Sequence, residues 1–296
     1  MKKTLYIVLA VLLSTGGCKT RQPLQIQPLP SFDREAHRGG RGLNPENTIP
    51  AMLKAIDLGV TTLEMDAHIT SDRKVVLMHD DQINPLFTLN NGKELTKEEA
   101  KKSVIYQMNY TDLDRFDVGS KYYSAFPQQV KQQAQIPLLE DLIVSVQNYL
   151  KATGKPQVFY NIETKSSIKG DNIFHPEPEI FVKLLMNVIE KKKNISPWVI
   201  VQSFDPRTLE VLHTQYPEIK TAFLVSNNSL EENLKLLSFL PTIYSPNLKL
   251  VTAELIKDCH YKGMKIIPWT VNEKNEITRL KLLGVDGIIT DYPNLF

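Results

Sequence analysis

Runs of β-branched and aromatic residues alternate with amphipathic helical stretches along most of this chain, and no other feature constrains its fold as strongly. Such alternation predicts a parallel sheet built from βα units. The candidate strands are 34–37, 62–69, 75–79, 158–163, 199–204, 221–225, 242–245, 265–270 and 287–289, and the candidate helices are 48–58, 139–151, 177–192, 206–215, 229–239, 253–261 and 273–283. If 75–79 is a hairpin partner of the second strand, eight βα units remain, the number in a (β/α)8 TIM barrel.

The chain length fits one barrel with an N-terminal extension. The chain has 296 residues, and α/β barrels often occupy about 200 to 250 residues as a single domain. We predict that the domain spans residues 32–296. Residues 19–31 contain Gln and Pro in place of an apolar period, which is typical of an extended tether.

Residues 1–18 predict an export signal. Lys2 and Lys3 form a basic start, Leu5–Leu13 is a short apolar run, and small residues then lead to Cys18. A cysteine in this setting resembles the lipobox of bacterial lipoproteins. We therefore expect an exported, membrane-anchored lipoprotein on the periplasmic or cell-surface side, with lipidated Cys18 as its first mature residue. Thr15 stands where the lipobox usually has Leu, which leaves a plain signal peptide as the alternative.

The charge balance argues against nucleic acid as a partner. The formal net charge is +2, and the two lysines at the extreme N-terminus account for both charges, because 35 basic residues face 33 acidic ones. A body without net charge lacks the basic surface that a phosphate backbone requires.

One long stretch, Asp80–Ile136, interrupts the alternation and exceeds the length of a typical βα loop. Asn90–Gly92 has the composition of a hairpin turn, and Thr96 with Glu99 forms a capping box that predicts a short helix. We therefore predict a small inserted subdomain after the second strand hairpin. Because βα loops lie on the face where barrels carry their active sites, this subdomain is expected to overhang the site. A stabilising role away from the chemistry is the alternative.

Three carboxylates are candidates for a metal site. Glu64 and Asp66 lie two residues apart in an extended run, so both side chains leave the strand on the same face. Two carboxylates this close repel unless a cation lies between them or one keeps its proton, and Glu163 offers a third carboxylate at the end of another strand. Such ligands suit one divalent cation, Ca²⁺ or Mg²⁺, without distinguishing the two ions. An exposed or salt-bridged pair is the alternative.

Two histidines occupy the C-terminal ends of predicted strands, where barrels carry catalysis. His37 ends the first strand and His79 ends the hairpin strand, and this placement beside carboxylates favours acid–base catalysis over a structural role. Arg38 offers a planar donor group that suits phosphate, and Lys165 adds a second positive charge near Glu163. Proton-transfer groups, a cation and charge neutralisation are what phosphodiester cleavage requires.

A few other residues carry weaker indications. His68 shares a strand face with two of the carboxylates and is expected to be structural or at the rim of the site, with metal ligation as the alternative. Trp269, at a late strand end, either closes the pocket against substrate carbons or packs in the core. Tyr122, Tyr123 and Phe126 in the insertion either contact a cationic leaving group or form the core of the subdomain.

The order and spacing of several motifs resemble the glycerophosphodiester phosphodiesterase family. The resemblance covers about residues 33–296, is most specific in its N-terminal motifs, and departs from the family pattern at Leu138 and in the loop Gly40–Asn44. The motifs are His37-Arg38-Gly39, Pro45-Glu46-Asn47-Thr48, Glu64-x-Asp66, Thr70-x-Asp72, His79-Asp80, Ile136-Pro137-Leu138-Leu139-Glu140, Asn161-Ile162-Glu163-Thr164-Lys165, Gln202-Ser203-Phe204, Trp269-Thr270-Val271-Asn272 and Gly284-Val285-Asp286-Gly287-Ile288-Ile289-Thr290-Asp291-Tyr292-Pro293.

The resemblance implies a role for each candidate residue. Glu64, Asp66 and Glu163 would bind the divalent cation, and His37 and His79 would share the proton transfers as general acid and base. Arg38 and Lys165 would hold phosphate oxygens. Such a pair of histidines predicts a bell-shaped pH profile, and the sequence does not say which is the acid.

Three functions remain open at this point. The favoured one is metal-dependent hydrolysis of small glycerophosphodiesters, such as glycerophosphocholine or glycerophosphoethanolamine, to sn-glycerol 3-phosphate and an alcohol. The second is a phospholipase that acts on intact lipid headgroups beside the membrane. The third is a lipoprotein that binds glycerophosphodiesters without cleaving them. Retention of both histidines and all three carboxylates argues against the third. The headgroup, the oligomeric state and the membrane leaflet are not predicted.

Overall fold

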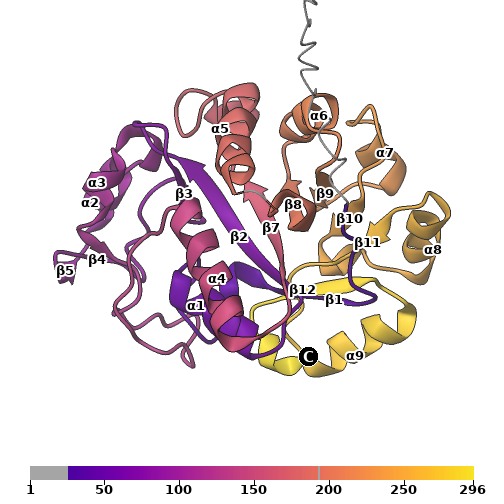
Figure 1. Ribbon diagram of the computed structural model, residues 1–296, viewed down its shortest axis with the longest axis horizontal. Helices are drawn as coiled ribbons and strands as arrows, with labels where there is room; N and C mark the ends of the chain where they lie inside the picture. Colours follow the sequence, from indigo (N-terminus) through magenta and orange to yellow (C-terminus); the bar gives the residue numbers. More distant parts are fainter. Residues whose placement is uncertain (1–25, 193) are drawn as a thin grey trace, which may run out of the picture.

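Eight parallel strands form the predicted barrel in a computed structural model that describes residues 26–192 and 194–296 (Figure 1). They are hydrogen-bonded in the order β11-β10-β9-β8-β7-β2-β1-β12, so strands that follow one another along the barrel chain are also neighbours in the sheet. Cys18 and the predicted export signal lie outside the described residues. The barrel strands are β1 (Asp33–Ala36), β2 (Thr62–Ile69), β7 (Phe159–Thr164), β8 (Val199–Ser203), β9 (Lys220–Val225), β10 (Ile243–Pro246), β11 (Lys265–Ile266) and β12 (Gly287–Thr290).

The barrel closes between β11 and β12 through backbone hydrogen bonds outside a regular ladder. The amide of Asp286 donates to the carbonyl oxygen of Ile266 and the amide of Ile289 to that of Pro268, each at 3.0 Å. The strand predicted at 265–270 is shortened to its first two residues, because Pro268 has no amide hydrogen to offer a ladder. The predicted (β/α)8 fold class is confirmed. Among the described residues, β11 and β12 are the one pair of neighbouring barrel strands without a regular ladder between them.

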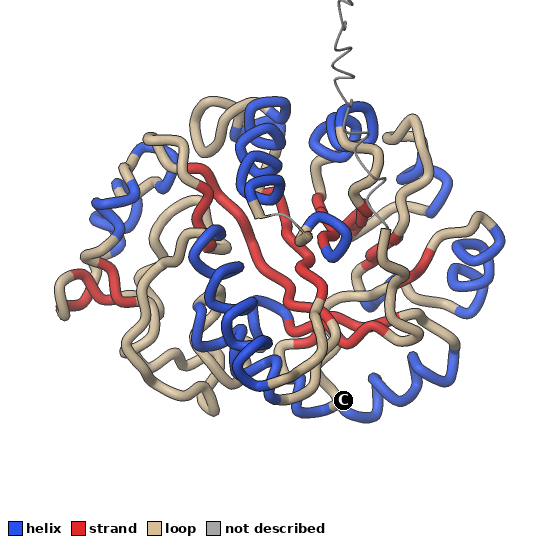
Figure 2. The backbone as a smooth tube through the Cα atoms, in the orientation of Figure 1, coloured by secondary structure: helices blue, strands red, loops and turns tan. Residues whose placement is uncertain are grey.

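Within the described residues, seven α-helices each follow one barrel strand and cover the outside of the sheet (Figure 2). One predicted helix, 229–239, is too long, since α7 ends at Leu234. The chain turns there so that the hydroxyl of Ser238 donates to Glu210 at 2.7 Å, while Phe239 stacks on the ring of His213. The barrel helices are α1 (Ile49–Asp57), α4 (Leu139–Thr153), α5 (Pro178–Lys191), α6 (Pro206–Gln215), α7 (Leu230–Leu234), α8 (Ala253–Tyr261) and α9 (Lys274–Leu283).

The insertion after β2 is a small subdomain with a core of its own. The strand β3 (Val75–Leu77) pairs antiparallel with β2, as a hairpin should. The turn after β4 places Asn91 and Gly92 at positive φ, 48° and 75°, and Thr96 with Glu99 forms a capping box, both as predicted. The subdomain contains β4 (Leu89–Asn90), β5 (Lys93–Glu94), α2 (Lys97–Lys102), α3 (Tyr110–Leu113) and β6 (Phe116–Asp117), around a buried cluster that includes Met78, Ile83, Phe87, Leu95, Ile105, Leu113, Phe116 and Ile136.

The inside of the barrel is apolar toward the N-terminal ends of its strands. Leu29, from the segment before β1, packs against this apolar interior. Its neighbours Pro28 and Pro30 line a cleft with residues that immediately precede β2, β7 and β8. The segment before β1 therefore lies at the N-terminal end of the barrel, and Figure 1 shows it as the indigo stretch that leads into β1. The interior cluster consists of Phe159, Ile200, Ala222, Ile243, Ile267 and Ile289.

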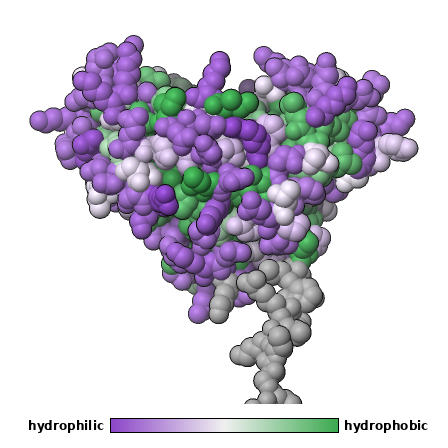
Figure 3. All heavy atoms as spheres, turned by 90° about the horizontal axis from the view of Figure 1, so that it is seen from above, coloured by the Kyte–Doolittle hydropathy of each residue, from purple (hydrophilic) through white to green (hydrophobic). Residues whose placement is uncertain are grey.

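Hydrophobic side chains on the outer surface are dispersed. Figure 3 shows them on one face as small green patches between hydrophilic residues, which is ordinary for a folded domain. None of the helices in the described ranges is both long and apolar enough to cross a bilayer.

Candidate active site

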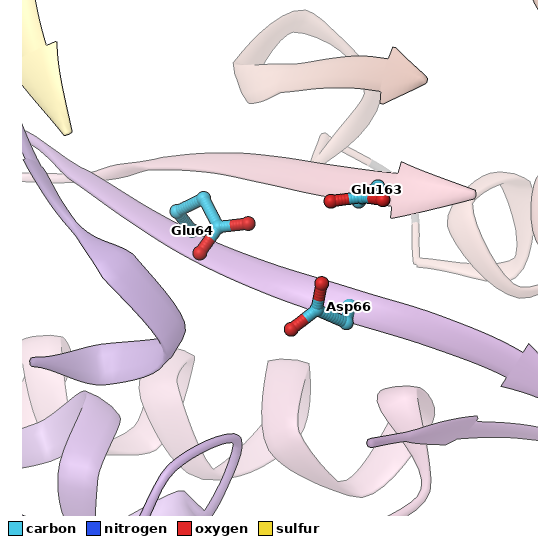
Figure 4. A group of neighbouring side chains, drawn as sticks. All are labelled: Glu64, Asp66 and Glu163. Carbon is cyan, nitrogen blue, oxygen red and sulfur yellow. The ribbon is translucent and has the colours of Figure 1, made fainter. Parts of the chain in front are cut away.

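The three predicted carboxylates converge toward the C-terminal ends of two adjacent strands (Figure 4). Glu64 and Asp66 project from β2, and Glu163 projects from β7 in register with Asp66. One oxygen from each carboxylate lies within 4.8 Å of the oxygens of the other two, and all three residues are buried. Oxygens at this spacing can surround one ion, because ligands on opposite sides of Ca²⁺ or Mg²⁺ are about 4 to 5 Å apart.

The charge around this cluster also fits a cation. Burial raises the pKa of Glu64 well above its usual range, and the neighbouring charges of Asp66 and Glu163 raise it further. Burial raises the pKa of Glu163 as well, although Lys165 opposes this shift. Burial disfavours ionised Asp66 too, but Arg38 and Lys165 outweigh it and lower its pKa. One buried oxygen of Asp66, Oδ1, accepts no hydrogen bond from the described residues. A divalent cation would offset the repulsion and satisfy this oxygen.

Hydrogen bonds from inside the barrel fix the Glu64 carboxylate. Its Oε1 accepts from Nε2 of Gln202 at 2.8 Å, and its Oε2 accepts from the backbone amide of Arg38 at 2.7 Å. The side-chain amide of Asn161 in turn donates to Gln202 at 3.1 Å and to Glu35 at 2.7 Å. Burial raises the pKa of Glu35 well above its usual range. This chain of polar groups connects the carboxylate cluster to the middle of the barrel and restricts the rotation of Glu64.

A carboxylate orients His37. Its Nδ1 lies 2.6 Å from Oδ1 of Asp291, the residue directly after β12, and Arg41 and Asn272 each donate to Asp291 at 2.7 Å. Because a carboxylate only accepts, Nδ1 carries the hydrogen and Nε2 of the neutral ring is left to act as a base. Burial and the charge of Arg38 lower the pKa of His37 to about 4, even though Asp291 opposes the shift. His37 is therefore neutral near pH 7.

His79 is oriented in the same way from the other side of the site. Its Nδ1 lies 2.6 Å from Oδ1 of Asp80, whose Oδ2 accepts from the side-chain amide of Asn84 at 2.7 Å. The fully buried ring of His68 lies close by, with Nε2 at 3.2 Å from the carbonyl oxygen of His79. Burial, followed by the charge of Lys165, lowers the pKa of His68 to about 3. His68 thus contacts the backbone of His79 and is not part of the carboxylate cluster.

The two cationic residues predicted to bind phosphate lie against carboxylates. Nη1 of Arg38 donates to Glu46 at 2.9 Å, and its Nε lies 3.2 Å from Asp66. Nζ of Lys165 lies 2.9 Å from Glu163 and 3.6 Å from Asp66. These pairs hold both cations at the cluster, and their contact with a phosphate stays a prediction.

A cavity of about 140 Å³ connects these groups. Trp269 lines it, donates from Nε1 to the carbonyl oxygen of Ser245 at 2.9 Å, and meets Phe204 edge to face. The ring of Trp269 is thereby fixed as an apolar wall. The cavity is lined by His37, Arg38, Arg41, Glu64, His79, Glu163, Gln202, Phe204, Leu224, Trp269, Thr270 and Ile289.

Phe126 of the insertion packs against the lining of this cavity. The guanidinium of Arg41, which lines the cavity, lies 4.8 Å from the ring centroid of Phe126. Phe126 also packs edge to face against Tyr123, and Tyr123 contacts Phe87 of the subdomain core. Tyr123 and Phe126 therefore contribute to the packing of the insertion, while Tyr122 is exposed.

Several residues that hold this site together had no role predicted from the sequence. Asp291 orients His37, Gln202 holds Glu64, and Asn47 donates to Asp66 at 2.8 Å while accepting from the Asp66 amide at 3.1 Å. Asp291 directly follows a strand, and Gln202 lies near the C-terminal end of one. A polar residue at this place in a barrel strand was the signal that could have identified them.

Comparisons with known proteins agree with this architecture. A sequence model described as the glycerophosphoryl diester phosphodiesterase family matches residues 37–295. The glycerophosphodiester phosphodiesterase of Bacillus altitudinis is 31% identical over 261 residues, which cover 88% of this chain and 94% of that protein. A crystal structure from Silicibacter pomeroyi, assigned to the glycerophosphoryl diester phosphodiesterases, has a TM-score of 0.78 at 27% identity and covers 91% of this chain and 93% of its own.

A further structure shares the fold alone. The phosphodiesterase of Oleispira antarctica, solved in complex with the product sn-glycerol 3-phosphate, is 22% identical with a TM-score of 0.69, covering 90% of this chain and 94% of its own.

Proposed function

Because this chain belongs to the glycerophosphoryl diester phosphodiesterase family, we propose that it hydrolyses glycerophosphodiesters to sn-glycerol 3-phosphate and an alcohol with the help of one divalent cation. The observation that carries the proposal is a single cavity lined by both carboxylate-bound histidines and by two of the three clustered carboxylates, Glu64 and Glu163. Relatives at this level of identity bear the name of the same activity.

The two histidines divide the proton transfers in this proposal. Nε2 of the neutral His37 accepts the proton of the attacking oxygen, which belongs to water or to the 2-hydroxyl of the glycerol unit, as that oxygen bonds to phosphorus. The bond from phosphorus to the alcohol oxygen breaks, and Nε2 of His79 donates a proton to the departing alkoxide. Asp291 stabilises the imidazolium that forms at His37. If the 2-hydroxyl attacks, the cyclic phosphate is then opened by water.

The cation and the basic residues neutralise charge. A bound Ca²⁺ or Mg²⁺ held by Glu64, Asp66 and Glu163 would supply Lewis-acid polarisation of the phosphoryl group. Arg38 and Lys165, which already lie at the cluster, would add positive charge on the phosphate oxygens. Trp269 would pack against the glycerol carbons, because its ring forms the apolar wall of the same cavity.

A hydrolysis assay on the full chain in mild detergent tests this proposal. We expect release of sn-glycerol 3-phosphate from glycerophosphoethanolamine that stops with chelator, returns with Ca²⁺ or Mg²⁺, and falls at least about a thousandfold in His37→Ala and in His79→Ala. Circular dichroism of each variant controls for folding. A folded wild-type protein that binds the diester but releases no product with either ion would support the non-catalytic binding function instead.

We also propose that the chain is exported and lipidated at Cys18. The supporting observation is the basic, apolar and small-residue sequence before this cysteine. Labelled palmitate should enter the wild-type chain and the control variant Cys259→Ala, whose cysteine is buried, but not Cys18→Ala. Equal labelling of wild type and Cys18→Ala would contradict lipidation at this residue.

A further inference from the structure

Two carboxyl groups on β1 lie inside the barrel, closer to its N-terminal end than the carboxylate cluster. Asp33 and Glu35 are two residues apart on the strand, so their side chains share one face, and they are 1% and 0% exposed. Glu35 is in register with Thr62, two residues before Glu64. The basic residue between them, Arg34, leaves the strand on the opposite face, and no basic side chain of the described residues forms an ion pair with either carboxyl group. Two such carboxylates would repel each other unless a proton or an ion lies between them.

The hydrogen bonds around this pair leave one oxygen of each carboxyl group without a donor. Oδ1 of Asp33 accepts from the hydroxyls of Thr61 and Thr62, each at 2.6 Å, and Oε2 of Glu35 accepts from Nδ2 of Asn161 at 2.7 Å. The remaining oxygens, Oδ2 of Asp33 and Oε1 of Glu35, are buried and accept from no donor among the described residues. The two carboxyl groups lie within hydrogen-bonding reach of each other. Because carboxylate oxygens only accept, this contact needs a proton, and one proton satisfies both oxygens.

Glu35 is the better holder of this proton, and Asp33 is the better holder of the negative charge. Burial raises the pKa of Glu35 well above its usual range, and the charges of Asp33 and Glu64 raise it further. Burial also raises the pKa of Asp33, but the hydrogen bonds from Thr61 and Thr62 oppose that rise. The hydroxyl groups therefore stabilise a charge on Asp33 that nothing comparable stabilises on Glu35.

The proton on Oε1 of Glu35 fixes the direction of the hydrogen bonds that lead to Glu64. With that proton donated to Asp33, Oε2 of Glu35 can only accept, so Asn161 must turn its Nδ2 toward it. The second hydrogen of Nδ2 goes to Oε1 of Gln202 at 3.1 Å, which leaves Nε2 of Gln202 to donate to Glu64 at 2.8 Å. If Asn161 turned over, Gln202 would have to turn as well and would present an oxygen to the Glu64 carboxylate. An acceptor at Glu35 therefore sets a donor at Glu64.

We propose that Glu35 is a positioning residue for the cation site and that it shares one proton with Asp33. The oxygen that bears the proton donates to Asp33, and the other oxygen orients Asn161 and, through it, Gln202. Gln202 then always offers Glu64 a donor, so one oxygen of Glu64 is held and the carboxylate stays in place for the ion. This inference rests on the proposed cation site and adds to it the residues that prepare one of its ligands.

Calorimetric titration of the full chain with Ca²⁺ and Mg²⁺ tests the positioning role. Glu35→Gln places an NH₂ group where the shared proton lies and keeps a carbonyl oxygen for Asn161, so its Kd should stay within about threefold of wild type. Glu35→Met has a similar shape and neither group, and its Kd should rise about tenfold or more, as for other groups that orient a metal ligand. Ile243→Ala, in the interior cluster, is the matched control and should lower Tm without changing Kd.

Infrared spectra of the cation-loaded protein test the shared proton. With the cation bound, Glu64 and Glu163 are ionised, so they contribute no band of a protonated carboxyl group. The wild type near pH 7 should show such a band, and Glu35→Gln should lack it. A band of equal strength in both proteins, or no band in the wild type, would overturn the shared proton.

The titrations separate this inference from the cation site on which it rests. If the wild type binds neither ion, the cation site fails and the positioning role fails with it. If the wild type binds an ion and a folded Glu35→Met binds it equally well, the cation site stands and the role of Glu35 is overturned. Equal losses in Glu35→Gln and Glu35→Met would overturn it too, because the charge of Glu35 would then be what matters. If Glu35→Met does not fold, its combination with Asp33→Asn, which removes the remaining buried charge, takes its place in the titration.

Discussion

At the scale of single residues, each of the two histidines proposed to be catalytic has a carboxylate bound to its Nδ1. Asp291 and Asp80 both lie 2.6 Å from Nδ1 of their histidines, which leaves Nε2 of each ring as the nitrogen for proton transfer. The two rings differ in burial, because the side chain of His37 is 13% exposed and that of His79 is 34% exposed. Burial lowers the pKa of the more enclosed ring, His37, which suits it to be the base.

Replacement of Asp291 by Asn should impair catalysis through His37. In the wild type, His37 becomes protonated as the pH falls through about 4, so kcat/KM should decline on that acidic side. Asp291→Asn should reduce kcat by about a thousandfold to ten-thousandfold through loss of the tautomer, as in other His–Asp pairs. It should also move the acidic limb to lower pH, because Asp291 raises the pKa of His37.

Complete pH–rate profiles of both proteins measure this effect. Asp286→Asn is the matched control, since Asp286 lies just before β12, at the opposite end of the strand from Asp291. An unchanged kcat in Asp291→Asn would rule out the proposed role of the pair.

Stabilisation by a cation should increase with pH. Glu64 and Glu163 have raised pKa values in the metal-free fold. At a pH above the ordinary pKa of a glutamate, each side chain therefore either stays protonated or carries an unfavourable buried charge. The metal-free protein thus loses this part of its stability as the pH rises, and a cation that displaces the protons restores it. Tm measured with Ca²⁺, with Mg²⁺ and with chelator from pH 5 to 8 should show a growing difference. Glu64→Gln should flatten that dependence, and a pH-independent difference in wild type would contradict the linkage.

At the scale of elements, sequence patterns predicted most of the barrel and missed where tertiary contacts set the boundaries. Both the strand Thr62–Ile69 and the helix Pro206–Gln215 match their predicted bounds. The end of α7 depends on a bond from Ser238 to an earlier helix, and the short β11 depends on Pro268. The carboxylate cluster followed from strand periodicity, but the partner of His37 lies 254 residues away in sequence, where no local pattern connects the two.

Residues 28–30, just before β1, should close the N-terminal end of the barrel, and we call this segment the plug. Leu29 packs against the interior cluster, so Leu29→Ala should remove apolar contacts and lower the unfolding free energy by about 1 to 2 kcal/mol. That corresponds to a Tm decrease of roughly 2 to 8 °C for a domain of this size. Thermal unfolding of Leu29→Ala beside the control Ile26→Ala, whose side chain is 56% exposed, measures the effect. Equal Tm values for the two variants would show that the segment does not contribute.

At the scale of the whole molecule, the plug and the candidate active-site cavity lie at opposite ends of the barrel. Pro28 and Pro30 meet residues that precede the strands, whereas His37 and Asp291 follow strands β1 and β12. The proposed attachment at Cys18 is only eight residues before Ile26, a reach of at most about 28 Å when fully extended. An attached protein would therefore present this cavity away from the membrane surface.

Attachment should then leave hydrolysis of small diesters unchanged. The wild-type protein on vesicles and the Cys18→Ala protein in solution should have kcat/KM values for glycerophosphoethanolamine within about twofold, since the cavity does not face the lipid. Vesicles of intact phospholipid should not compete with this substrate in either case. Inhibition by such vesicles, or hydrolysis of their lipids, would favour the phospholipase function.

The position of the plug determines from which compartment an attached protein would take its substrate. An enzyme attached at the closed end of its barrel takes its substrate from the aqueous compartment, and its turnover follows the concentration of free diester there. If the protein is anchored at Cys18, geometry alone would keep the surrounding lipids from the cavity. Degradation of membrane lipid would then have to pass through a separate deacylating step before this protein could take part.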